Sequence, residues 1–224
     1  MLLFNITNSA IKMHVEEAIQ DYAEQPITRQ MMLGLLKNYK RPYDKISELV
    51  KHGTLTPLKS GLYLPGPQLR INKPEPFLLA NHLLGPSYVS MEAALSYWSF
   101  IPERVYEVSS ATTQNSKLFK TAMGRFSYTH IPLPYYSFGI KQVALTSKQA
   151  VMVASPEKAL CDKIITTSGI LLRSVTQVTA LLTEDFRIER EKLLELNTIE
   201  IAKWISDAPK KNSLAMLVKT LQSI

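Results

Sequence analysis

Basic residues gather in one part of the chain, and their chemistry suits contacts with phosphate groups. Between residues 29 and 73 there are nine Lys or Arg and only two Asp or Glu, in a 224-residue chain of net charge +7. Lysine ammonium groups neutralise phosphates, and arginine can also bond guanine through two parallel hydrogen bonds. This density is typical of a nucleic-acid-binding surface, although a solvated lysine-rich face looks similar.

The candidate DNA contacts lie on and around one expected helix, residues 42–52 (PYDKISELVKH). Its apolar residues recur with a helical period, so the polar residues between them face outward. Arg41 suits guanine and the lysines suit phosphates. Asp44 and Glu48 on the same face leave a second interpretation open, a solvated helix in a protein-binding domain. The candidate DNA-binding residues are Lys40, Arg41, Lys45, Ser47, Lys51 and Lys59.

A second polar cluster lies in the segment ASPEKALCDKI, residues 154–164. Ser155, Glu157, Lys158 and Asp162 have the types needed for acid–base chemistry. Helix capping explains most of them equally well: Ser155 can cap a helix, Glu157 favours its positive end, and Lys158 can pair with Asp162 at i,i+4. We therefore expect no catalytic residue here and no enzyme.

Metal and cofactor chemistry lack their usual signals. The four histidines, at positions 14, 52, 82 and 130, are far apart, and the single cysteine is Cys161. No phosphate-binding glycine loop and no serine-hydrolase motif occurs. We expect no metal and no cofactor. One cysteine and no long apolar run favour a cytoplasmic protein without a membrane span.

The elements that would position the candidate DNA contacts occur in the order of a winged helix-turn-helix. Apolar periodicity predicts helices over about 8–22, 28–38 and 42–52, and residues 54–66 (TLTPLKSGLYLPG) resemble a two-stranded hairpin with Lys59 at its tip. In such domains the second helix of the pair enters the major groove. A proline-rich stretch follows, so we expect one domain over 1–70 and another over 71–224.

The second expected domain is mixed. Helices are predicted near 75–84 and 86–98. For the whole chain we expect the α+β class: a winged helix-turn-helix followed by a mixed α/β domain that has a helical C-terminal part. Val-, Tyr- and Thr-rich runs predict strands at 104–111, 125–131, 141–146 and 150–154. Helices are then expected at 156–168, 174–183, 188–196, 198–207 and 213–223.

Several motifs of the second domain resemble the AbiE-type antitoxins, which are the regulatory component of type IV toxin–antitoxin systems. The resemblance covers roughly residues 25–170 and includes LVKHGTLTPLKSGLYLPG at the expected hairpin. Its motifs are PSYVSMEAALSYWSFIPE at 86–103, SSATT at 109–113, GRFSYTHIP at 124–132 and VASPEKALCDKI at 153–164.

The resemblance implies a winged helix that represses its own promoter and a second domain that antagonises a nucleotidyltransferase-like toxin. The expected partners are thus double-stranded promoter DNA and that toxin. Two alternatives stay open: a winged-helix regulator whose second domain senses a small effector and has no toxin partner, and an enzyme that uses the Ser155 to Asp162 cluster.

Overall fold

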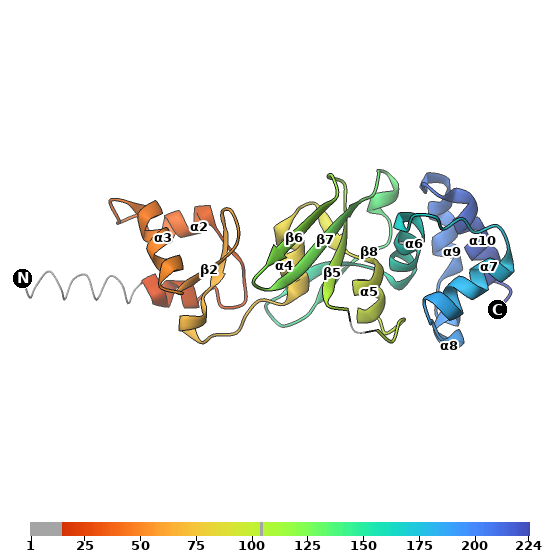
Figure 1. The fold of residues 1–224 in the computed structure, drawn as a ribbon, viewed down its shortest axis with the longest axis horizontal. Coiled ribbons are helices and arrows are strands. Elements are labelled where there is room, and N and C mark those ends of the chain that lie inside the picture. Colours follow the sequence, from red (N-terminus) through yellow and green to blue (C-terminus); the bar gives the residue numbers. More distant parts are fainter. Residues whose placement is uncertain (1–14, 104) are drawn as a thin grey trace, which may run out of the picture. The chain divides into compact units, whose positions relative to one another are not determined.

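The computed structural model describes residues 15–103 and 105–224, and it confirms the α+β class predicted from the sequence. The chain divides into two compact units (Figure 1). Unit 1 comprises the chain up to Leu83 together with Thr121–Met123 and Ala144–Gln149; unit 2 comprises Leu84–Lys120, Gly124–Val143 and Ala150–Ile224. The division falls after Leu83, beyond the expected boundary near residue 70.

Unit 1 has helices first and a hairpin after them. Residues 15–20 are helical, and the first part of the helix expected over 8–22 lies outside the described residues. The elements that follow are β1 (Ile27–Thr28), α2 (Arg29–Leu35), α3 (Pro42–Lys51), β2 (Leu55–Lys59), β3 (Leu62–Pro65), the 3₁₀ turn η1 (Pro67–Leu69) and α4 (Pro76–Leu83).

Local chemistry explains where these elements start and stop. The side chain of Thr28 caps α2 by accepting a hydrogen bond from the Met31 amide at 3.2 Å. Pro42 occupies the first turn of α3, where its missing N–H costs nothing. Gly61 has φ +78° in the turn between β2 and β3, a value that favours glycine. Strand β3 pairs antiparallel with both β2 and β1, in the order β1-β3-β2.

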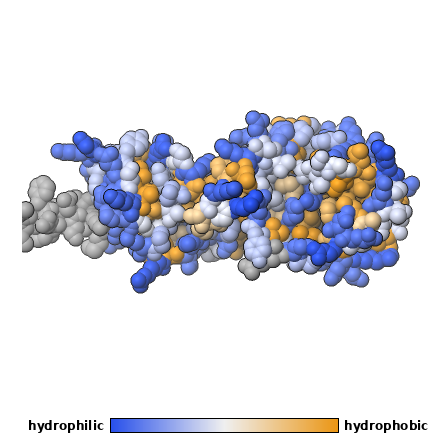
Figure 2. All heavy atoms as spheres, viewed as in Figure 1, coloured by the Kyte–Doolittle hydropathy of each residue, from blue (hydrophilic) through white to orange (hydrophobic). Residues whose placement is uncertain are grey.

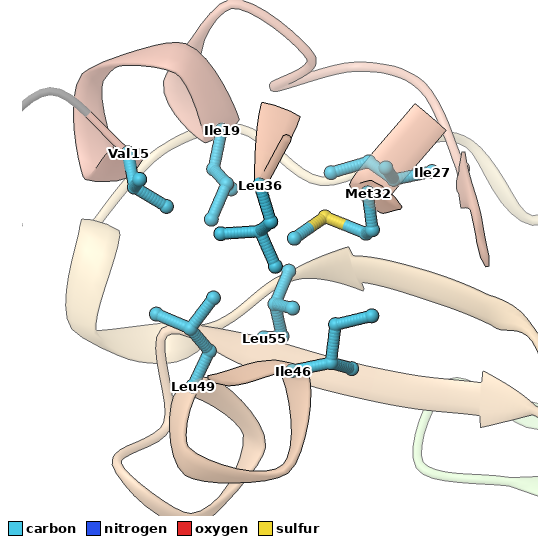
Figure 3. Packing of buried hydrophobic residues seen from close by; sticks show 8 residues of the cluster. All are labelled: Val15, Ile19, Ile27, Met32, Leu36, Ile46, Leu49 and Leu55. Atoms are coloured by element: carbon cyan, nitrogen blue, oxygen red, sulfur yellow. The ribbon is translucent and has the colours of Figure 1, made fainter. Parts of the chain in front are cut away.

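The core of unit 1 lies between its helices and β2. Met32 and Leu36 come from the α2 region, Ile46 and Leu49 from α3, and Leu55 from β2, and Figure 3 shows these side chains pointing toward one another. All are buried. Fully burying such a side chain contributes about 1.5–3 kcal/mol. This packing fixes α3 by one face and leaves its opposite face to solvent.

Unit 2 contains a six-stranded sheet in the order β6-β7-β5-β4-β9-β8. Strand β4 runs antiparallel to β5 and parallel to β9, and β5 runs parallel to β7, so the sheet is mixed. The strands are β4 (Ser87–Val89), β5 (Glu107–Thr112), β6 (Lys117–Thr121), β7 (Gly124–His130), β8 (Ile140–Ala144) and β9 (Ala150–Ala154).

Most helices of unit 2 lie in its C-terminal part, where the sequence predicted them, and one lies between β4 and β5. Helices α5 and α6 pack against each other, and α10 packs against α7 and α9. They are α5 (Met91–Tyr97), α6 (Pro156–Thr166), α7 (Val175–Ala180) continued by the π-helical turn η3 (Leu181–Asp185), α8 (Arg190–Leu194), α9 (Thr198–Trp204) continued by η4 (Ile205–Asp207), and α10 (Lys211–Leu221). A short 3₁₀ turn, η2 (Tyr135–Ser137), precedes β8.

Candidate nucleic-acid interface

Helix α3 presents its polar face to solvent, as its apolar period predicted. Ile46 and Leu49 are buried, whereas Asp44, Ser47 and Lys51 are exposed. Because α3 is anchored from one side only, the exposed face is available to a partner molecule.

The two basic residues before α3 are the most accessible of the candidates. The side chain of Arg41 is 84% exposed, and its Nη1 lies 3.7 Å from Oδ2 of Asp44, which is also exposed. An ion pair this open contributes little to stability and exchanges readily. Lys40 is exposed beside it. Arg41 and Lys40 can therefore turn to an anionic partner at small cost.

Two other candidates are held within α3 itself. The side chain of Lys45 is only 12% exposed; its Nζ lies 2.8 Å from Oε1 of Glu48 and 5.6 Å from the centre of the Tyr39 ring. The hydroxyl of Ser47 donates to the backbone oxygen of Tyr43 at 3.1 Å. Lys45 thus neutralises an acid on the outward face, and Ser47 reinforces its own helix.

Lys59 makes a contact that the sequence did not indicate. It is the last residue of β2, and its Nζ donates to the backbone oxygen of Leu83, the last residue of α4, at 2.6 Å. A cation at this end of a helix meets unsatisfied carbonyl groups and the negative end of the helix dipole. The pKa of nearby His82 is lowered by burial and, secondarily, by the charge of Lys59.

Arg29 lies beside the hairpin turn, and the sequence did not single it out. Its Nη2 donates to Oγ of Ser60 at 3.2 Å, and its backbone N–H donates to the oxygen of Gly61 at 2.8 Å. The side chain is exposed. The guanidinium of Arg29 therefore lies at the hairpin turn. The pairing of β1 with β3 places the start of α2 beside this turn.

The cluster predicted at Ser155, Glu157, Lys158 and Asp162 is structural in its geometry. The oxygen of Ser155 accepts from the amide of Lys158 at 3.2 Å and donates to Glu157 at 2.7 Å, as expected of a helix cap. Lys158 and Asp162 are completely buried with 3.0 Å between Nζ and Oδ1. No solvent-exposed surface of either side chain is left for a substrate.

Further polar groups complete this buried network. Oδ2 of Asp162 accepts from the hydroxyls of Tyr88 at 2.9 Å and Ser90 at 2.7 Å. Ser90 occupies the N-cap position of α5, but its hydroxyl donates to Asp162 and makes no cap hydrogen bond. Nζ of Lys158 donates to the backbone oxygen of Tyr135 at 2.9 Å and lies 3.3 Å from the centre of the Tyr135 ring.

Burial sets the proton affinities within the network. It lowers the pKa of Lys158, an effect that the charge of Asp162 opposes. It also raises the pKa of the Cys161 thiol, so this cysteine is not activated as a nucleophile.

Within 15–103 and 105–224, no three His, Cys, Asp or Glu residues are grouped so that they could hold a metal ion. His14 lies outside the described residues. In the same part of the chain, no helix combines the length and apolar character needed to cross a membrane.

Comparison with known proteins gives a likeness of fold. No protein-family model matches the chain, and no curated protein matches its sequence. The crystal structure of the RV2827C protein from Mycobacterium tuberculosis superimposes with a TM-score of 0.57 over 91% of this chain and 75% of that chain. The two sequences are 14% identical, so the similarity concerns the fold alone.

Proposed function

We propose that unit 1 is a winged helix-turn-helix that binds duplex DNA, with α3 in the major groove. One observation carries this proposal: α3 is packed on its inner face by Ile46 and Leu49, while the exposed Lys40 and Arg41 stand at its N-terminal end. The N-terminal part of such a helix is the part that reaches base edges. The hairpin β2–β3 follows α3, where a wing is found in this class of domain.

The contacts we propose combine predicted and newly located residues. Arg41 reads guanine, Lys40 and Lys51 hold phosphates, and Arg29 adds a guanidinium beside the hairpin turn. Lys45, Ser47 and Lys59 keep their intramolecular contacts and do not contact DNA. Lys45 and Ser47 stabilise α3, and Lys59 stabilises β2. This division follows from the intramolecular contacts of each side chain.

We further propose that the whole chain is an antitoxin that represses its own promoter and neutralises a nucleotidyltransferase-like toxin in the cytoplasm, without catalysing a reaction itself. The support is the resemblance of the motifs at 86–103 and 153–164 to AbiE-type antitoxins. Large hydrophobic side chains also lie exposed in the C-terminal part, among them Leu171 between α6 and α7, Leu194 on α8 and Ile199 on α9. Hydrophobic patches are visible on this part in Figure 2. Exposed apolar surface of this kind favours a protein partner.

DNA binding is tested by fluorescence anisotropy of the full chain on the duplex upstream of its own gene and on a random duplex of equal length. If four to six phosphates are contacted, the logarithm of the affinity should fall with the logarithm of salt concentration at a slope of about −4 to −5. Lys40→Ala with Arg41→Ala should lower the preference for the promoter over the random duplex by about 1–3 kcal/mol, the size of one bidentate guanine contact. The matched control is Lys211→Ala with Lys219→Ala, which removes two exposed lysines of α10.

Toxin neutralisation is tested by co-expression with a nucleotidyltransferase-like protein encoded next to the gene of this chain. The full chain should restore growth, and the Lys40/Arg41 variant should still protect while it fails to repress the promoter. Failure of the full chain to protect, at normal expression, overturns the antitoxin proposal and leaves the DNA-binding proposal intact.

One observation favours the alternative of an effector-sensing regulator. A cavity of about 440 Å³ in unit 2 is lined by Leu95, Ile101, Leu181 and Phe186, with Lys163 and Asp185 among its polar groups. Apolar pockets of this size with a few polar groups commonly hold small molecules. A regulator of that kind would release its promoter when an effector is added, whereas the antitoxin would respond to its toxin.

A further inference from the structure

The N-cap and the first two turns of α3 have four exposed side chains that could meet base edges: Arg41, Tyr43, Asp44 and Ser47. Three of them already have partners within the helix. Arg41 pairs with Asp44, and the Ser47 hydroxyl donates to the Tyr43 backbone oxygen.

Tyr43 differs from these neighbours. Tyr43 is 59% exposed. Among residues 15–103 and 105–224, its side chain makes no hydrogen bond, ion pair or ring contact. It follows Pro42, whose ring fixes the backbone, and its carbonyl is held by Ser47, so the position of the ring's attachment is rigid. Tyr43 thus presents an exposed aromatic ring on the polar face of α3, attached to a backbone that is held in place.

The chemistry of the major groove narrows what such a ring can recognise. The edges of guanine, adenine and cytosine present hydrogen-bonding groups there, whereas thymine also presents its 5-methyl group, which apolar side chains contact. A ring at the start of α3 can cover that methyl group, and its hydroxyl can donate to a neighbouring acceptor.

We propose that Tyr43 is the residue that reads thymine, by packing its ring against the 5-methyl group of one base in the operator. This inference rests on the proposed DNA binding of unit 1 and adds the base that the site selects. Arg41 then supplies a guanine contact next to it, so the preferred site contains guanine and thymine within the reach of one helix turn.

The test replaces thymines by deoxyuridine, which lacks only the methyl group, one position at a time in the promoter duplex. Anisotropy with the full chain should show a loss of about fourfold at one thymine position, the effect of one buried methyl group. Tyr43→Ala should bind more weakly and become insensitive at that position. Tyr43→Phe should keep the sensitivity, since the ring remains.

Tyr106→Ala is the matched control, because it removes an even more exposed tyrosine from unit 2. It should bind and respond to deoxyuridine as the unaltered chain does. Sensitivity that persists in Tyr43→Ala, with its circular dichroism unchanged, overturns the inference and assigns the methyl group to another residue. Binding without any response to deoxyuridine also overturns it while the DNA-binding proposal stands, and absence of binding to every duplex overturns both.

Discussion

The ammonium of Lys158 lies 3.0 Å from a carboxylate oxygen of Asp162, and both side chains are completely buried in unit 2. The two residues lie one turn apart on α6. Asp162 also accepts hydrogen bonds from the hydroxyl of Tyr88, in β4, and from that of Ser90, just after β4. Charges removed from water are costly unless each has its partner. The network therefore ties α6 to the centre of the sheet through groups that depend on one another.

Asp162→Asn should lower the free energy of unfolding by about 3–5 kcal/mol, because it leaves the buried charge of Lys158 without its counter-ion. Urea denaturation followed by circular dichroism measures the loss. The control is Glu195→Gln, which breaks the solvent-exposed pair of Lys192 and Glu195 and should cost less than about 1 kcal/mol. Equal effects of the two substitutions would show that the buried pair is not coupled as described.

Alkaline pH should destabilise unit 2 through the tyrosines around Asp162. Burial raises the pKa of Tyr88 and Tyr135 above the usual 10.0 and that of Tyr136 to about 12, and the charge of Asp162 adds to each effect. A raised pKa in the folded state gives stability that is complete below pH 10 and is lost as the pH rises through the folded value. The lowered pKa of Lys158 acts in the opposite direction only up to 10.5, so the net loss should appear above that pH.

Urea midpoints measured at increasing pH check this expectation, with tyrosinate absorbance as the second readout. Tyr136→Phe should make the alkaline decline shallower. Ionisation of all ten tyrosines with an ordinary pKa while the protein is still folded would contradict it.

Lys59→Met should destabilise unit 1 and leave the salt dependence of DNA binding unchanged. The substitution keeps the aliphatic stem but removes the hydrogen bond to the Leu83 oxygen, which we expect to cost about 1–2 kcal/mol. It should also raise the pKa of His82, because a positive charge that lowers it is removed. Nuclear magnetic resonance titration of His82 measures that change. A shallower salt slope would instead make Lys59 a phosphate contact.

Gly66→Ala should destabilise unit 1 by about 3 kcal/mol or more, because the added Cβ would lie 2.0 Å from the backbone oxygen of Gly53. Gly66 also donates to the oxygen of Thr54 at 2.7 Å, so the backbone cannot easily move away. Gly34→Ala is the control: its Cβ meets nothing within 4 Å, and it should stabilise α2 by up to about 1 kcal/mol. Thermal unfolding of both variants should shift in opposite directions.

The helices were largely predictable because their apolar periods and caps are local. Thr28, Pro42 and Ser155 start helices where the sequence placed them. Strand β1 was missed because two residues carry no periodic signal, and its pairing with β3 depends on a segment distant in sequence. Strand β4 was missed for a similar reason, since Ser87–Val89 lies inside a stretch interpreted as helix.

The candidate interface was predictable in its location and less so in its contacts. Exposure of Ser47 and Lys51 follows from the helical period of α3. The engagement of Lys45 by Glu48 is local, because the two residues lie three positions apart on one face of α3. The contacts of Lys59 with α4 and of Arg29 with the hairpin turn arise from tertiary packing, for which no local pattern exists.

The loop between β8 and β9 has a consequence for modular exchange of the two units. Strands β8 and β9 belong to the sheet of unit 2, whereas the segment between them, Ala144–Gln149, belongs to unit 1. There the buried side chain of Gln149 donates to the Glu24 carboxylate and accepts from the backbone amide of Glu75. A gene fusion that grafts the DNA-binding unit onto another partner, cut once after Leu83, would leave Glu24 and Glu75 without Gln149. Recombination can therefore shuffle this unit intact only if it carries that loop along, which favours inheritance of both units as a single piece.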